Sequence, residues 1–124
     1  MLKYRSAWLV GGWLLVSLIV YLSLTPHPPS PLSFPNADKL EHGFAYAVLS
    51  WWFCQIYLSL RQRGIVIVAM IIMGVVIEFL QGWSGYRYFE YADMLANSTG
   101  VMLGYLLART ALGRVFISIE KVWR

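Results

Sequence analysis

The stretch GIVIVAMIIMGVVIEFL, residues 64–80, decides the fold class of this chain. A helix needs about 20 apolar residues, with a range of roughly 17 to 25, to cross the hydrocarbon core of a bilayer. This segment meets that length, and its single charged residue is Glu78. Glu78 lies 13 residues beyond Ile65, which places it about 20 Å into a core about 30 Å thick. The segment therefore predicts a transmembrane helix with an acid inside it.

The composition of the whole chain agrees with a membrane protein. Of its 124 residues, 59% are hydrophobic and 13% are charged, whereas a soluble domain carries about 25% charged residues. The length predicts a single domain, residues 1–124. The one cysteine, Cys54, excludes an intrachain disulfide.

Three more segments have the length of a span. They are residues 7–24, about 40–60 and about 91–108, and together with 64–80 they predict an all-α membrane protein with four transmembrane helices. All five prolines lie between residues 26 and 35, so the first connection cannot be helical throughout. The second connection, RQR at 61–63, is so short that it predicts an antiparallel hairpin.

The basic residues predict the orientation. Four spans place eight of the ten lysines and arginines on one side of the membrane: Lys3, Arg5, Arg61, Arg63, Arg109, Arg114, Lys121 and Arg124. The positive-inside rule makes that side cytoplasmic, with both termini there. Because the net charge of +4 follows the topology in this way, we expect no nucleic-acid partner.

The C-terminal tail, RVFISIEKVWR, has a helical apolar face. Its members are Val115, Phe116, Ile119, Val122 and Trp123. Such a face predicts a short amphipathic helix that lies on the cytoplasmic membrane surface, with a frayed chain end as the alternative.

Most of the acids and amides fall at the opposite, outer face and predict a binding site. The predicted site residues are Asp38, Lys39, His42, Glu78, Gln81, Arg87, Asp93 and Asn97. A charged acid at the bilayer centre costs a few kcal/mol, and less towards the interface. Glu78 should therefore face the bundle interior, and its natural partners are Arg87, Lys39 and His42.

This cluster has two interpretations: a functional polar pocket, or a network that only holds helices together. Interhelical hydrogen bonds in membranes are worth about 0.6 kcal/mol each on average, which is small beside the insertion cost and favours a pocket. Within a pocket, Arg87, Lys39 and His42 suit an anion such as a lipid phosphate. Glu78, His42 and Asp93 are the candidates for acid–base catalysis. One histidine with scattered acids is a weak metal signal, so we predict no metal and no cofactor.

Small residues recur along the fourth predicted helix at every fourth position: Ala96, Gly100, Gly104 and Ala108. This pattern contains GxxxG, which permits close approach of two helices. Packing within one chain is favoured over a seam between two chains.

The order of these motifs resembles the VanZ-like family of membrane proteins. The resemblance rests on DKLEH at 38–42, IEFLQ at 77–81, and the pattern R-x5-D-x3-N-x2-G-x3-G, which is read here as Arg87, Asp93, Asn97, Gly100 and Gly104. It covers residues 38–104 and implies a small four-helix protein of bacterial membranes. The family takes its name from a protein linked to resistance to the glycopeptide teicoplanin, and it offers no settled activity to carry over.

We therefore expect a multi-pass, cell-envelope protein of the bacterial cytoplasmic (inner) membrane. Its partner would be a membrane lipid or a phosphorylated envelope intermediate, bound through the headgroup at the outer face, and a change in glycopeptide sensitivity would be a downstream effect. The alternatives are an enzyme acting on a lipid-linked substrate, and a non-catalytic subunit that docks on another membrane protein.

Overall fold

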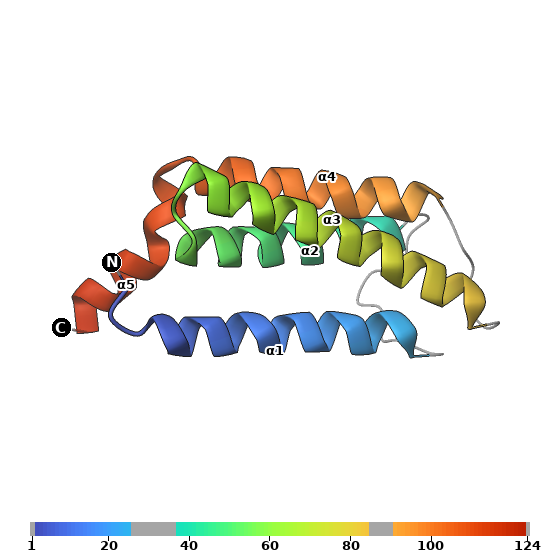
Figure 1. Ribbon diagram of the computed structural model, residues 1–124, viewed down its shortest axis with the longest axis horizontal. Helices are drawn as coiled ribbons and strands as arrows, with labels where there is room; N and C mark the ends of the chain where they lie inside the picture. Colours follow the sequence, from blue (N-terminus) through green and yellow to red (C-terminus); the bar gives the residue numbers. More distant parts are fainter. Residues whose placement is uncertain (1, 26–36, 85–90, 124) are drawn as a thin grey trace.

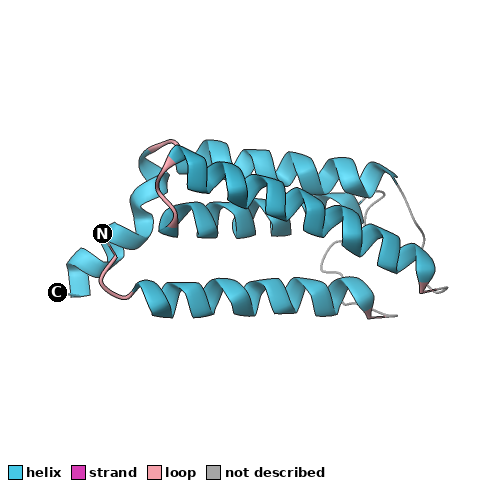
Figure 2. Cartoon of the chain, in the orientation of Figure 1, coloured by secondary structure: helices cyan, strands magenta, loops and turns pink. Residues whose placement is uncertain are grey.

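The computed structural model describes residues 2–25, 37–84 and 91–123, without the side chains of residues 37 and 38 (Figure 1). Its elements are α1 (Arg5–Leu24), α2 (Ala37–Ile56), α3 (Leu60–Trp83), α4 (Tyr91–Ala108), the 3₁₀ turn η1 (Ala111–Arg114) and α5 (Val115–Trp123). The described ranges contain helices and their connections but no strand (Figure 2). The all-α prediction is confirmed, and the four predicted segments each coincide with a helix.

The four long helices lie side by side and alternate in direction, with both termini at one end of the bundle (Figure 1). Helix α2 is central, since it contacts every other described element: α1, α3, α4, η1 and α5. The core is correspondingly centred on α2, where Leu49 and Cys54 are fully buried, as is Val101 of α4. A chain that reverses direction at each connection brings the start of α2, the end of α3 and the start of α4 to one end.

Two of these helices, α1 and α3, are by themselves long and apolar enough to cross a membrane. A third span is present if α4 is joined with the segment through Trp123, from which it is bent by 79°. Helix α2 carries Lys39, Glu41 and His42 in its first turns, and those polar side chains dilute an otherwise apolar helix. Length and composition of the described helices thus support two or three spans.

The turn between α2 and α3 lies at residues 57–59, so the predicted turn at 61–63 is wrong. The reason is the cap at Ser59, whose side chain accepts a hydrogen bond from the backbone N–H of Gln62 at 3.1 Å and starts α3 early. Arg63 then lies in the first turn of α3. Its guanidinium donates to the carbonyl oxygens of Cys54 and Tyr57 at 2.8 and 3.1 Å, and so caps the end of α2.

The glycines of α4 pack on α2 within the chain, as the GxxxG pattern predicts. A Cβ atom at Gly100 would collide with the backbone of Gly43, and one at Gly104 would collide with the carbonyl of Ala47. The two helix backbones are therefore in direct contact, which fixes their separation and brings the first turns of α2 and α4 together.

The C-terminal helix forms as predicted, but it is anchored more firmly than an amphipathic pattern implies. Phe116 is 2% exposed and stacks on Trp8 of α1 at a centroid distance of 3.9 Å. Glu120 is fully buried and accepts hydrogen bonds from the backbone N–H groups of Lys3 and Tyr4, at 2.6 and 3.0 Å, and from the Trp8 indole at 2.8 Å. These contacts hold the two termini of the chain together.

Candidate functional site

The described part of the predicted site lies where α2 begins, α3 ends and α4 begins. Four of its side chains are almost completely enclosed: Glu78, Gln81, Asp93 and Asn97 are between 1% and 6% exposed. Lys39 and His42 lie on α2 at the same end of the bundle and are partly exposed. Asp38 lies in the first turn of α2, but its side chain and the whole of Arg87 lie outside the described residues.

Glu78 faces the bundle interior, with only 1% of its surface exposed. Gly74 lies one helical turn before Glu78 on the same face of α3, and a Cβ atom there would come within 3.5 Å of the Tyr46 ring of α2, so Tyr46 borders this site. Tyr46 is itself 2% exposed and was not among the residues predicted from the sequence. The available signal was its spacing, because His42 and Tyr46 are one helical turn apart on one face of α2. The predicted pairing of Glu78 with Arg87 remains a prediction.

An ion pair joins α2 to α4 at the edge of the site. The ammonium of Lys39 lies 3.6 Å from a carboxylate oxygen of Asp93, and their side chains are 25% and 8% exposed. The lysine that the sequence offered as a partner for Glu78 thus has a defined contact with Asp93. Because the pair is only partly buried, Lys39 keeps access to the surroundings of the bundle.

Gln81 joins α3 to α1. Its side-chain N–H donates to the backbone carbonyl of Ser23 at 2.7 Å, and both residues are buried. This hydrogen bond satisfies a carbonyl in the last turn of α1. Gln81 therefore connects α3 to α1, and no local feature of the α1 sequence predicts this contact.

Three buried polar atoms of this site make no hydrogen bond to any described residue: Nδ1 of His42, the hydroxyl oxygen of Tyr46 and Oδ1 of Asn97. Two of the residues meet at Gly74 of α3. A Cβ atom on that glycine would lie 3.3 Å from Asn97 and 3.5 Å from the Tyr46 ring. The small residue lets side chains from α2 and α4 converge on the backbone of α3. Most buried polar atoms in proteins have a hydrogen-bond partner, so three that lack one among the described residues need an explanation.

The arrangement contains both donors and acceptors. A histidine ring nitrogen and a tyrosine hydroxyl can each donate or accept, whereas an amide oxygen accepts only. Glu78 and Asp93 add carboxylates, and Lys39 adds a cation at the edge. The described ranges hold no group of three or more His, Cys, Asp or Glu side chains that is placed to bind a metal.

The chain matches the VanZ/LLP1 family of proteins over residues 16–112, which includes every residue of the site. It belongs to the VanZ/LLP1 family, as its motifs predict. A similar protein from the fission yeast Schizosaccharomyces pombe, which is itself uncharacterised, is 30% identical over 96 residues. That match covers 75% of this chain and 57% of the yeast protein, so the chain spans little more than half of its relative. No solved structure matches the chain.

Proposed function

We propose that this protein crosses the membrane four times, with both termini in the cytoplasm. Its polar site then binds a polar or phosphorylated lipid headgroup, or a phosphorylated envelope intermediate, at the outer face. The charge distribution supports this orientation. The described basic residues at the end that holds the termini are Lys3, Arg5, Arg61, Arg63, Arg109, Arg114 and Lys121, while Lys39 lies at the other end. The positive-inside rule assigns the first of these ends to the cytoplasm.

The observation that carries the headgroup proposal is the set of three buried polar atoms on His42, Tyr46 and Asn97. A buried polar atom that loses its water without gaining a partner costs about 1–3 kcal/mol. A network that served only to connect helices would satisfy its own atoms, as Gln81 does with Ser23. Atoms that have no partner among the described residues are available to the oxygens and hydroxyls of a ligand. Lys39 at the rim suits a phosphate.

We also propose that the protein lies in the bacterial cytoplasmic membrane, as the resemblance to the VanZ-like family implies. Glycopeptide sensitivity would then change as a consequence of an altered envelope lipid and is not itself the activity. The enzyme alternative uses the same residues, with Glu78, His42 or Asp93 as acid or base. It differs from the binding proposal in one measurable respect, because an enzyme converts the lipid that it binds.

The test removes one hydroxyl. Tyr46→Phe deletes the unpartnered oxygen and keeps the ring, and Tyr21→Phe is the matched control, because Tyr21 is 67% exposed on α1. We expect Tyr46→Phe to weaken binding of phosphatidylglycerol by about tenfold, or about 1.4 kcal/mol, in native mass spectrometry of the full chain. Thermal unfolding of the free protein should be unchanged or shifted upwards, since an unsatisfied group is lost.

Loss of stability without a selective loss of lipid binding would instead assign Tyr46 to a helix-connecting network and refute the proposal. Conversion of the bound lipid to a product, abolished by Glu78→Gln or Asp93→Asn, would favour the enzyme.

A further inference from the structure

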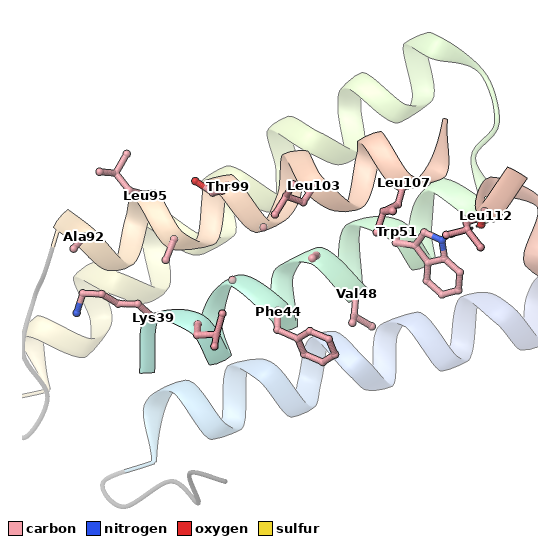
Figure 3. A pocket seen from close by; sticks show the side chains of 15 residues that line it. Lys39, Phe44, Val48, Trp51, Ala92, Leu95, Thr99, Leu103, Leu107 and Leu112 are labelled. Carbon is pink, nitrogen blue, oxygen red and sulfur yellow. Dashed lines mark hydrogen bonds between the residues drawn. The ribbon is translucent and has the colours of Figure 1, made fainter. Parts of the chain in front are cut away.

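Helix α4 has an apolar outer face and a polar inner face, and Asn97 lies on the inner one. The outer side of the α2–α4 pair is an apolar groove whose lining includes Phe44, Leu95 and Leu103 (Figure 3). Asn97 does not line this groove, and only 4% of its surface is exposed. Its amide is therefore enclosed by the bundle and does not face the surroundings of the protein.

Tyr46 of α2 meets Asn97 inside the bundle, at Gly74 of α3. A Cβ atom on that glycine would lie 3.3 Å from the amide nitrogen of Asn97 and 3.5 Å from the Tyr46 ring. Tyr46 is 2% exposed, and His42 lies one helical turn before it on α2. Oδ1 of Asn97 and the hydroxyl of Tyr46, both buried, have no hydrogen-bond partner among the described residues. Two unsatisfied groups from different helices thus share one small region.

These two groups make opposite demands on a ligand. The amide oxygen of Asn97 can only accept a hydrogen bond, so the ligand must bring an O–H or N–H group to it. The hydroxyl of Tyr46 has a hydrogen to donate, so the ligand must also bring an acceptor. Nδ1 of His42 can donate or accept and adds no restriction. A matching ligand therefore carries a donor and an acceptor close together.

Headgroup chemistries differ in how they meet these demands. The oxygens of a phosphodiester accept hydrogen bonds, but the group has no hydrogen to donate. An ammonium group donates but does not accept. A hydroxyl group does both, since it has one hydrogen and two lone pairs. Among these three groups, the hydroxyl alone satisfies both Asn97 and Tyr46, and it is also small enough for an enclosed place.

We infer that the site takes a headgroup with a free hydroxyl group, such as that of a glycerol or a sugar, which donates to Oδ1 of Asn97 and accepts from the hydroxyl of Tyr46. The inference rests on the headgroup binding proposed above and specifies which part of the headgroup is recognised. A phosphate alone is then insufficient, because it leaves the amide oxygen of Asn97 without a donor.

The test compares lipids with identical acyl chains in native mass spectrometry of the full chain. Phosphatidylglycerol carries free hydroxyls, whereas phosphatidylethanol has the same phosphodiester and the same charge but no hydroxyl. We expect phosphatidylglycerol to bind about tenfold more tightly, or by about 1.4 kcal/mol, because phosphatidylethanol leaves a buried acceptor unsatisfied. Monoglucosyl diacylglycerol has hydroxyls without a phosphate, and its affinity relative to phosphatidylglycerol distinguishes a sugar from a glycerol as the source of the hydroxyl.

Variants of Asn97 assign the preference to its side chain. Asn97→Leu removes the acceptor with a branched side chain of similar shape, so it should abolish the preference for phosphatidylglycerol without weakening phosphatidylethanol. Asn97→Asp keeps an acceptor oxygen and should keep the preference. Gln62→Leu is the matched control, because it removes an exposed amide at the opposite end of the bundle, and it should change nothing.

Equal binding of phosphatidylglycerol and phosphatidylethanol, both tighter than phosphatidylcholine, would overturn the inference and leave the headgroup site standing. Phosphatidylethanolamine that bound as tightly as phosphatidylglycerol would overturn it too, since an ammonium would then supply the donor. A preference that persisted in Asn97→Leu would place the hydroxyl elsewhere. If no lipid bound more tightly than phosphatidylcholine, the proposed function itself would fail. The lipid comparisons use the unmodified protein, so they decide even where a variant does not fold.

Discussion

Replacing Glu120 with alanine is expected to release α5 from the rest of the protein. The carboxylate accepts three hydrogen bonds, from the backbone N–H groups of Lys3 and Tyr4 and from the indole of Trp8. Tyr4 is the N-cap of α1, and its own side chain makes no capping hydrogen bond, so Glu120 fixes the chain that enters the helix from the far end of the sequence. The negative charge also lies where the dipole of α1 is positive.

The magnitude follows from these contacts. Loss of the two backbone hydrogen bonds costs about 1 kcal/mol, because Lys3 and Tyr4 are exposed and water can replace the carboxylate. A Trp8 N–H left without a partner costs about 2 kcal/mol. Together they amount to about 3 kcal/mol, or roughly a 100-fold increase in the open population of α5. Glu120→Gln keeps the size of the side chain and one acceptor oxygen, so it should cost about 1 kcal/mol.

Hydrogen exchange of the α5 amides is the appropriate assay, because it reports local opening without global unfolding. In detergent, Glu120→Ala should speed exchange across residues 115–123 by about 100-fold, and Glu120→Gln by less than about tenfold. Lys121→Ala is the matched control, since Lys121 is an exposed neighbour on the same helix. If Glu120→Ala changed α5 exchange no more than Lys121→Ala does, the carboxylate would not be what holds the termini together.

Three further substitutions test the packing that positions the site. Gly100→Ala places a methyl group against the backbone of Gly43, so we expect thermal unfolding to show a loss of about 2 kcal/mol or more; a change below 0.5 kcal/mol would contradict direct backbone contact. Arg63→Gln removes the cap on the end of α2 and should lower the free energy of unfolding by about 1–2 kcal/mol. Hydrogen exchange should become faster only in the α2–α3 turn, and unchanged exchange there would argue against the cap. Gln81→Leu leaves the carbonyl of Ser23 without its donor, so thermal unfolding should show a loss of about 1–2 kcal/mol in the free energy of unfolding. Equal stability of the variant and the unmodified protein would indicate that this hydrogen bond contributes little.

The sequence predicts the helices because each one depends on the residues of its own segment. Apolar length and the proline-rich connection place all four long helices, and Glu78 is correctly expected to face inward because an acid on the lipid side is too costly. Only the helix ends are misplaced. The end of α2 and the start of α3 depend on Ser59 and Arg63, whose capping contacts compete with the apolar pattern. The predicted binding role of the site residues remains a prediction.

What the sequence could not supply are pairings between distant segments. Glu120 and Lys3 are 117 residues apart, and neither has a local feature that names the other. Gln81 and Ser23 meet only because α1 and α3 lie together at that end of the bundle. Tyr46 belongs to the site because Gly74 makes room for it on α3, which is a property of packing. Such contacts exist only once the helices are assembled.

The two ends of the bundle treat buried polar groups differently, and this contrast bears on function. At the end that holds the termini, buried polar side chains are matched to partners: Glu120 has three donors, and Gln55 donates to the carbonyl of Leu112 and accepts from the N–H of Phe116. At the other end, Gln81 is also paired, with the carbonyl of Ser23, but His42, Tyr46 and Asn97 keep buried atoms without a described partner. The chain therefore satisfies these buried polar atoms at one end and leaves three without a described partner at the other. These atoms without a described partner lie at the same end of the bundle as Lys39, where a ligand with its own oxygens and hydroxyls would satisfy them.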